Sequence, residues 1–115
     1  MLVGGEPGIG KSTLLLQISA TMARNSETVA YISGEESVSQ VKLRSERLGI
    51  GGNGIFFLSE PDLAAVLECL ETLSPALAIV DSIQTMYLDD VAGMPGSVSQ
   101  VRECTWRLER LSLIH

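Results

Sequence analysis

The chain has 115 residues, a length that accommodates one small domain, and apolar residues make up 45% of it, which excludes a disordered chain. Its formal net charge of −6 excludes a surface that binds nucleic acid through bulk positive charge. No apolar run approaches the length of a membrane span, and no export signal is visible. Because Cys69 and Cys104 lack the spacing of metal ligands or of a disulfide framework, we expect buried or inert thiols and a cytoplasmic location.

A glycine-rich loop stands near the start of the chain. Residues 5–13 read GEPGIGKST and match the phosphate-loop pattern G-x-x-x-x-G-K-[ST]. Such a turn lets backbone N–H groups close around phosphates, while Lys11 can reach the phosphate oxygens and the Ser12 hydroxyl can ligate Mg²⁺. A glycine turn that binds no nucleotide is the alternative. It is the weaker one, because a strand precedes the loop and a helix follows it. We predict that the nucleotide contacts Gly5, Glu6, Pro7, Gly8, Ile9, Gly10, Lys11, Ser12 and Thr13.

Strands and helices alternate through the rest of the chain, which predicts an α/β fold with a mostly parallel sheet and helices on both faces. Apolar runs predict strands at residues 1–4, 28–33, 55–58 and 77–81. Helical patterns fall at about residues 12–25, at 38–48, after a capping pattern at 59–62, and from residue 97 onward. No repeat, linker or low-complexity tract divides the chain, so residues 1–115 are expected to belong to one domain.

The helical periods also predict which side chains face the core. Near one face of the helix at 38–48 lie Val38, Val41 and Leu48. The last helix is expected to turn inward Val98, Val101, Leu108 and Leu111. For Trp106, burial is the preferred interpretation, and stacking on Arg102 one turn earlier is the alternative.

Two predicted strands end in carboxylates, at the edge where open α/β sheets place their ligands. Asp81 is interpreted as a Mg²⁺ ligand because it ends the apolar strand LAIVD after a phosphate loop; capping of the next turn is the alternative. Either Glu35 or Glu36 could orient the attacking water. We favour Glu35, which directly follows Gly34, and expect Glu36 to face solvent or the next helix. The alternative is that both only stabilise a helix N-terminus.

Several stretches resemble the RecA-like ATPase family, and within it a bacterial branch of recombination ATPases. The resemblance spans Leu2 to about Leu111. It rests on LVGGEPGIGKSTLLLQ, on VAYISGEES followed by QVKLRSERLG, and on IVDSIQT followed by PGSVSQVREC. A whole superfamily shares the phosphate loop, whereas the paired stretches ISGEES and DSIQT with PGSVSQVREC are far more specific.

The resemblance implies an enzyme that hydrolyses ATP with Mg²⁺ and acts on DNA. It assigns catalysis to Lys11 and Glu35, and Mg²⁺ to Ser12 and Asp81. In RecA-like ATPases the loop after the Mg²⁺-binding strand contacts single-stranded DNA, which carries over to about residues 87–97, predicted from sequence to be a mobile loop. The residues expected to contact DNA are Met94, Gly96, Ser97 and Arg102. Members of the bacterial branch are ring-shaped hexamers that drive branch migration of recombination intermediates in DNA repair.

Parts that the resemblance implies are missing from the sequence. They are an N-terminal four-cysteine zinc motif, a KNRFG motif and a C-terminal protease-like domain. A later core strand, which in RecA-like cores lies between the phosphate-loop strand and the Asp81 strand, is also missing. We therefore expect a truncated part of an ATPase core, with a vacant strand position and with a cation from a neighbouring subunit needed to complete the site.

Three alternatives stay open. Another RecA-like ATPase, such as a helicase core, shares the phosphate loop but is not expected to carry PGSVSQVREC. A small-molecule kinase needs an arginine-rich lid, which the sequence lacks. A non-catalytic nucleotide-binding fragment is the third, because core segments are missing.

Overall fold

The computed structural model describes residues 2–5, 9–24, 27–49, 54–81 and 83–114. Within these ranges the strands are β1 (Leu2–Gly5), β2 (Val29–Ser33), β3 (Ile55–Ser59) and β4 (Leu77–Asp81). The helices are α1 (Ile9–Arg24), α2 (Val38–Arg47), α3 (Leu63–Leu73), the 3₁₀ helix η1 (Ile83–Thr85) and α4 (Val98–Ile114). None of these helices combines the length and the apolar character needed to cross a membrane.

The strands form one parallel sheet in the order β1-β4-β2-β3. Every residue of β2 and of β4 is buried, as expected for inner strands of a parallel sheet that is covered on both faces. The bounds of β4 are those predicted from the sequence. β2 and β3 differ from the prediction by one residue at one end, and β1 is shifted by one residue at both ends. Apolar runs of β-branched residues thus identified the strands correctly.

β1 lies directly beside β4, which corrects the expectation of a vacant strand position between them. Their register pairs Leu2 with Ala78 and Gly5 with Asp81. Because the two strands hydrogen-bond to each other along this seam, their backbone groups find partners without a further strand between them. The seam also brings the end of β1 next to the end of β4.

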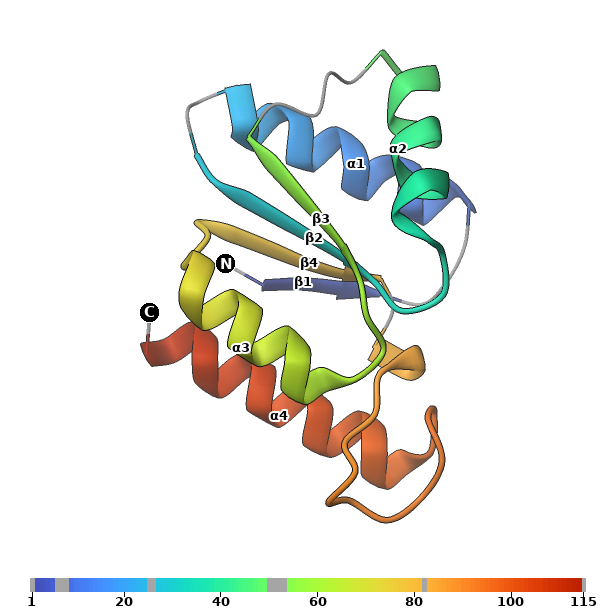
Figure 1. Ribbon diagram of the computed structural model, residues 1–115, viewed down its shortest axis with the longest axis vertical. Helices are drawn as coiled ribbons and strands as arrows, with labels where there is room; N and C mark the ends of the chain where they lie inside the picture. Colours follow the sequence, from blue (N-terminus) through green and yellow to red (C-terminus); the bar gives the residue numbers. More distant parts are fainter. Residues whose placement is uncertain (1, 6–8, 25–26, 50–53, 82, 115) are drawn as a thin grey trace.

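Helices cover both faces of the sheet (Figure 1). On the face of α1 and α2, the buried side chains include Leu16, Tyr31 and Ile79. On the face of α3 and α4, Ile32 and Val80 are buried with residues of both helices. Neighbouring residues of a strand point to opposite faces, so β2 and β4 contribute to both cores. Each large apolar side chain buried in this way contributes about 1.5–3 kcal/mol to folding.

The N-cap of α3 is Asp62, whereas the sequence pattern at 59–62 favours Ser59. The Asp62 carboxylate accepts a hydrogen bond from the N–H of Ala64 at 3.0 Å. The Ser59 hydroxyl donates instead to the carbonyl of Glu36 at 2.9 Å. Asp and Ser are both good caps, and Ser59 is still within β3, so the nearer residue caps the helix.

In two helices, hydropathy predicted only some of the buried residues, with Val41 and Leu108 buried as predicted. In α2, Val41 and Ser45 are buried, while Leu48 is exposed. In α4, Val98 is 72% exposed. Among residues 98–111 of α4, whose burial the structure describes, the buried residues recur every fourth position and are Gln100, Cys104 and Leu108. Each inward stripe includes a polar side chain, which a purely apolar pattern overlooks.

Trp106 is half exposed, which corrects the interpretation that it is packed in the core. The guanidinium carbon of Arg110 lies 5.2 Å from the centroid of the Trp106 ring. The ring therefore stacks with Arg110, one turn later in α4, and not with Arg102 as the alternative had it.

The two cysteines lie in different environments. Cys69 is exposed on α3, so burial, one of the two expected states of the thiols, does not hold for it, whereas Cys104 is fully buried. Burial raises the pKa of the Cys104 thiol, because a thiolate is poorly solvated in the core. Burial and a raised pKa both protect Cys104 from reagents that attack thiolates.

We predict that iodoacetamide at pH 8 alkylates Cys69 of the folded chain and leaves Cys104 unmodified. Mass spectrometry of the digested protein measures the two sites separately. In denaturant both sites should react, and Cys69→Ser should remove labelling of the folded chain. Equal labelling of both cysteines without denaturant would contradict the buried position of Cys104.

Candidate functional site

The carboxyl ends of the strands and the N-terminal end of α1 lie at one edge of the molecule (Figure 1). The register places Gly5 of β1 and Ser33 of β2 on either side of Asp81, the last residue of β4. At this edge of a parallel sheet, a helix N-terminus offers unpaired N–H groups and the positive end of its dipole. The edge therefore favours an anionic ligand.

The predicted phosphate loop lies at this edge, between β1 and α1. Its residues 6–8, which are Glu6, Pro7 and Gly8, fall outside the described residues. The structure places Gly5 at the end of β1 and Ile9, Gly10, Lys11, Ser12 and Thr13 in the first turns of α1. The helix begins three residues before the predicted start, so the second half of the motif is helical. Backbone N–H groups in a first turn have no partner within the helix and are free to bind phosphate.

Asp81 is buried at the end of β4, with 8% of its surface exposed. It shares one face of the strand with Leu77 and Ile79, the face that packs against α1. The hydroxyl of Tyr31 donates a hydrogen bond to Oδ2 of Asp81 at 3.2 Å. The carboxylate therefore lies on the side of the sheet where the phosphate loop continues into its helix.

The surroundings of Asp81 can be compared with what Mg²⁺ requires of a protein. Among the described residues, no three potential metal ligands of the His, Cys, Asp or Glu type gather. Mg²⁺ commonly binds proteins through one or two oxygens and takes its other ligands from phosphates and water. Asp81 and a hydroxyl in the first turn of α1, as the motif provides with Ser12, fit that pattern.

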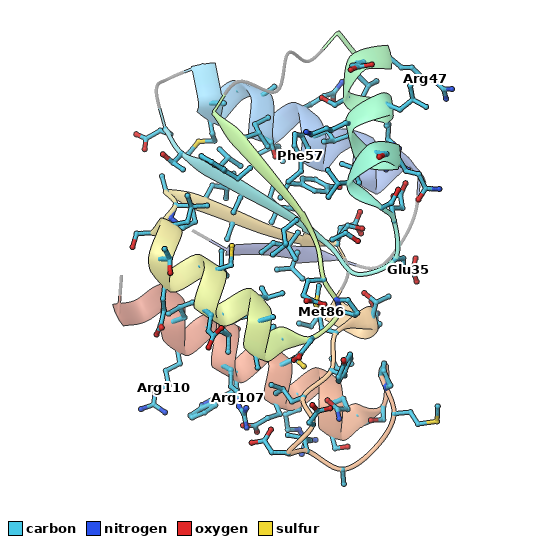
Figure 2. The ribbon with its side chains drawn as sticks, in the orientation of Figure 1. Glu35, Arg47, Phe57, Met86, Arg107 and Arg110 are labelled. Atoms are coloured by element: carbon cyan, nitrogen blue, oxygen red, sulfur yellow. The ribbon has the colours of Figure 1, made fainter. Side chains whose placement is uncertain are left out.

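The turn between β2 and α2 carries two carboxylates, one exposed to solvent and one in an ion pair. The N–H of Glu36 donates to Ser33 Oγ at 2.9 Å, and its carbonyl accepts the bond from Ser59. Its carboxylate is paired with Arg44 of α2. Glu36 therefore faces the next helix, whereas Glu35 is exposed at the carboxyl edge of the sheet (Figure 2).

A close contact joins this turn to η1. The N–H of Gly34 donates to the carbonyl of Asp81 at 3.1 Å. A Cβ atom at position 34 would overlap the side chain of Thr85 and lie 2.8 Å from its Cβ, so only glycine fits. The stretches ISGEES and DSIQT, which are far apart in the sequence, thus pack against each other at the site.

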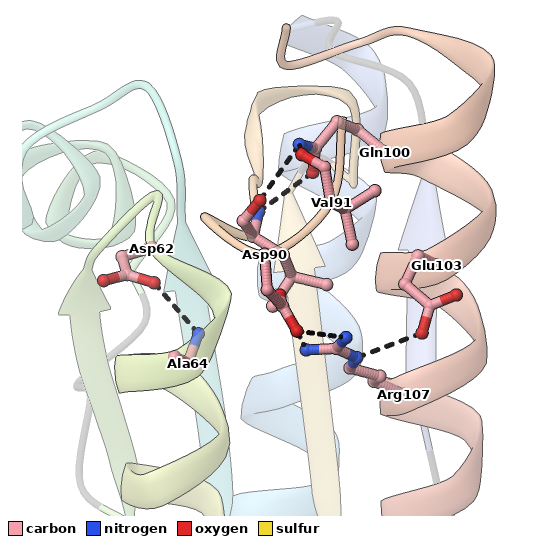
Figure 3. A network of polar contacts seen from close by, with 8 residues as sticks. Asp62, Ala64, Asp90, Val91, Gln100, Glu103 and Arg107 are labelled. Atoms are coloured by element: carbon pink, nitrogen blue, oxygen red, sulfur yellow. Dashed lines mark hydrogen bonds and ion pairs between the residues drawn. The ribbon is translucent and has the colours of Figure 1, made fainter. Parts of the chain in front are cut away.

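The loop before α4 is tied to that helix by Gln100, which is 2% exposed (Figure 3). Gln100 Oε1 accepts a hydrogen bond from the N–H of Leu88 at 2.9 Å. Its Nε2 donates to the carbonyls of Leu88 at 3.1 Å and Val91 at 2.8 Å, and lies 3.1 Å from that of Gly93. One buried amide therefore satisfies backbone groups along most of the loop.

Arg107 forms a second tie from α4 to the loop (Figure 3). Its guanidinium donates to both carboxylate oxygens of Asp90, at 2.9 and 3.3 Å, and to Glu103 at 3.1 Å. The pKa of Asp90 is lowered from its usual value, mainly by the hydrogen bond from Arg107. Because Asp90 is exposed, this pair orders the loop more than it stabilises the fold.

The residues expected to contact DNA lie at the end of this loop and at the start of α4. Met94 is 79% exposed, and Gly96 has a φ of +88°, which favours glycine. Ser97 Oγ accepts a hydrogen bond from the N–H of Gln100 at 3.4 Å as α4 begins. Arg102 is exposed one turn into the helix. The four residues therefore lie within one short stretch, which follows Asp81 and η1 in the chain.

Comparison with known proteins gives one consistent result. No family model matches the chain. Over 112 residues it is 53% identical to the DNA repair protein RadA of Bacillus subtilis (strain 168). It is 53% and 52% identical to the proteins of that name from Listeria monocytogenes and Halalkalibacterium halodurans. Each match covers 97% of this chain. The chain matches a segment of bacterial DNA repair protein RadA.

The chain spans about a quarter of the length of these RadA proteins, since each match covers 24% of the relative. The match to RadA and the parallel sheet with helices on both faces confirm the predicted fold class, a part of a RecA-like α/β core. The resemblance stated from the sequence motifs is confirmed by the same match.

Sequence reasoning missed three side chains that organise the site, and each left a readable signal. Tyr31 carries the one aromatic hydroxyl in the buried strand TVAYIS. Thr85 follows Asp81 within DSIQT, the motif that packs on Gly34. Gln100 stands four residues before Cys104, on the inward stripe of α4. A polar residue at an inward position needs a partner, and that requirement is the signal.

We predict that Gln100→Leu destabilises the chain by about 1–3 kcal/mol, because it removes the partner of the buried N–H of Leu88 and the bond to the carbonyl of Val91. Urea denaturation followed by circular dichroism measures the change. The control is Ser99→Ala, which removes an exposed 2.8 Å bond to the carbonyl of Ala92 in the same loop and should cost about 1 kcal/mol or less. Equal stability of the two variants would show that Gln100 does not anchor the loop.

Proposed function

We propose that this chain is the ATP-binding part of a DNA repair ATPase of the RadA type. The observation that carries the proposal is the position of Asp81. It is a buried carboxylate beside Gly5, where the phosphate loop starts, and it lies on the face of the sheet that α1 covers. That is the place where a Mg²⁺ ion bound to nucleotide phosphates requires a protein oxygen.

Each residue of the site then has a defined role. The loop N–H groups and Lys11 bind the β- and γ-phosphates, and Ser12 and Asp81 hold Mg²⁺. Bound Mg²⁺ neutralises charge on the phosphate oxygens. Glu35 orients and polarises the attacking water. The pairing of Glu36 with Arg44 supports this choice, because it leaves Glu35 as the carboxylate of the turn that faces solvent.

Single-stranded DNA is the proposed partner of the loop before α4. Met94 and Arg102 are exposed, and Gly96 and Ser97 lie between them. With a net charge of −6 for the whole chain, affinity for phosphate has to come from local groups such as Arg102 and from neighbouring subunits. In the chain, η1 stands between Asp81 and this loop, so binding of DNA at the loop and of nucleotide at Asp81 can influence each other.

The motor activity belongs to the complete protein in this proposal. Residues 1–115 form one part of the RecA-like ATPase domain, and the chain spans about a quarter of its RadA relatives. Assembly into a hexameric ring, a cation supplied by the neighbouring subunit, and branch migration of recombination intermediates all require more than this chain. ATP binding is the step that this chain's own residues support most directly.

We predict that the chain binds a fluorescent ATP analogue in the presence of Mg²⁺ and that Lys11→Ala weakens the binding at least about tenfold, because a charge-assisted contact to phosphate is lost. Fluorescence anisotropy at constant ionic strength measures the affinity. The matched control is Lys42→Ala, which removes the same charge from an exposed position on α2 and should change nothing.

Glu35→Gln adds the test of catalysis. It should preserve binding of the analogue and lower any hydrolysis by about 10²–10⁴-fold, as expected when a general base is lost. Equal weakening of binding by Lys11→Ala and Lys42→Ala would overturn the proposal. Binding that depends on Lys11, without hydrolysis that depends on Glu35, would favour the non-catalytic nucleotide-binding alternative for this chain.

A further inference from the structure

Tyr31 joins the core of the protein to the carboxylate of Asp81. It is 1% exposed in the middle of β2, and its hydroxyl lies 3.2 Å from Oδ2 of Asp81. The hydroxyl donates this bond because the carboxylate, when ionised, can only accept. An aromatic hydroxyl buried this deeply needs a polar partner, and the last residue of the neighbouring strand provides one.

The sheet explains why the ring reaches that position. Tyr31 is opposite Ile79 in the register of β2 and β4, and Asp81 lies two residues further along the same face. The ring centroid of Phe57, opposite Tyr31 on β3, is 6.0 Å from that of Tyr31, with the planes inclined at 47°. Because Phe57 supports the ring from the other side, the hydroxyl is held toward the carboxyl edge of the sheet.

The bond restricts how the carboxylate can turn. Rotation of the Asp81 side chain would break this bond, which is unfavourable because both groups are buried. Partners of a metal-binding carboxylate act in this way in metalloproteins, where they orient the ligand before the cation arrives. The rigid strands β2 and β4 carry both residues, so the orientation is defined by the sheet and not by a loop.

We propose that Tyr31 is a positioning residue that fixes the Asp81 carboxylate for the divalent cation bound together with the nucleotide. The inference rests on the proposed function, since it requires that Asp81 hold Mg²⁺. It assigns to Tyr31 an effect on cation-dependent binding, with no contact to the nucleotide itself. If Tyr31 only filled the core, its substitution would instead change the stability of the fold. Any effect on nucleotide binding would then be the same with and without Mg²⁺.

The test is Tyr31→Phe, which removes the hydroxyl and keeps the ring. Affinity for the fluorescent ATP analogue is measured with Mg²⁺ and again with EDTA. With Mg²⁺ the variant should bind about tenfold more weakly than the wild type, the lower end of the effect seen when a partner of a metal ligand is removed. With EDTA the two proteins should bind equally. An equal loss in both conditions, or no loss in either, would overturn the inference.

Two further variants make the result specific. Phe57→Leu loosens the packing on the Tyr31 ring and keeps the hydroxyl, so it should weaken Mg²⁺-dependent binding less than Tyr31→Phe does and should leave binding with EDTA unchanged. In an Asp81→Asn background, which lacks the carboxylate, Tyr31→Phe should have no additional effect on Mg²⁺-dependent affinity. A full additional effect in that background would mean that the hydroxyl does not act through Asp81.

The outcomes separate the inference from the proposed function. If the wild type does not bind the analogue, or if Lys11→Ala binds it equally well, the proposed function is overturned, and the inference with it. Binding that depends on Lys11 and Mg²⁺, together with an unchanged Tyr31→Phe variant, would overturn the inference alone.

Discussion

The parallel direction of the strands is the constraint on which the candidate site depends. Because β1, β2 and β4 run the same way, their last residues Gly5, Ser33 and Asp81 come to one edge, side by side in the register. The N-terminal end of α1 lies at the same edge. An antiparallel neighbour would have moved one of these groups to the opposite end of the sheet. The apolar residues of β2 and β4 therefore contribute to the chemistry by setting strand order and direction.

Hydrogen bonds from buried side chains extend this order beyond the sheet. Tyr31 holds the carboxylate of Asp81, and Gln100 holds the loop that follows η1. Between them, the N–H of Tyr87 bonds the carbonyl of Pro61, and the carbonyl of Tyr87 accepts from the N–H of Leu63. The segment from the end of β4 to the start of α4 is thus fastened at several points. Such a segment transmits a displacement better than a free loop does, because its parts move together.

Much of the fold could be predicted from the sequence, and the reason is local. Strands such as LAIVD are short, apolar and bounded by polar turns, so composition alone identifies them. The phosphate loop was predicted from a fixed spacing of residue types, and Asp81 was predicted as a Mg²⁺ ligand from its place at the end of an apolar strand. The pairing of β1 with β4 could not be predicted, since strand order depends on contacts between residues far apart in the chain.

Side-chain direction was harder to predict than secondary structure. Val98 was expected inside and is exposed, while Gln100 is inside. A prediction from the spacing of apolar residues considers only the cost of exposing them to water. Gln100 is buried because backbone groups of the loop form hydrogen bonds with its amide. The position of Glu35 next to the site depends on Arg44 and Ser59, which hold the neighbouring residue from two other elements. Such ties become visible only once the elements are assembled.

The contact between Gly34 and Thr85 has a consequence for how this sequence can change over time. The two residues occupy one shared volume, so a side chain gained at position 34 has to be matched by atoms lost at position 85. A single substitution at either position leaves the contact overpacked or leaves a cavity. Either result destabilises the protein, so such substitutions are expected to be accepted slowly in evolution. The stretches ISGEES and DSIQT are therefore expected to drift as a coupled pair, and a designer who transplants one of them into another protein should transplant the other as well.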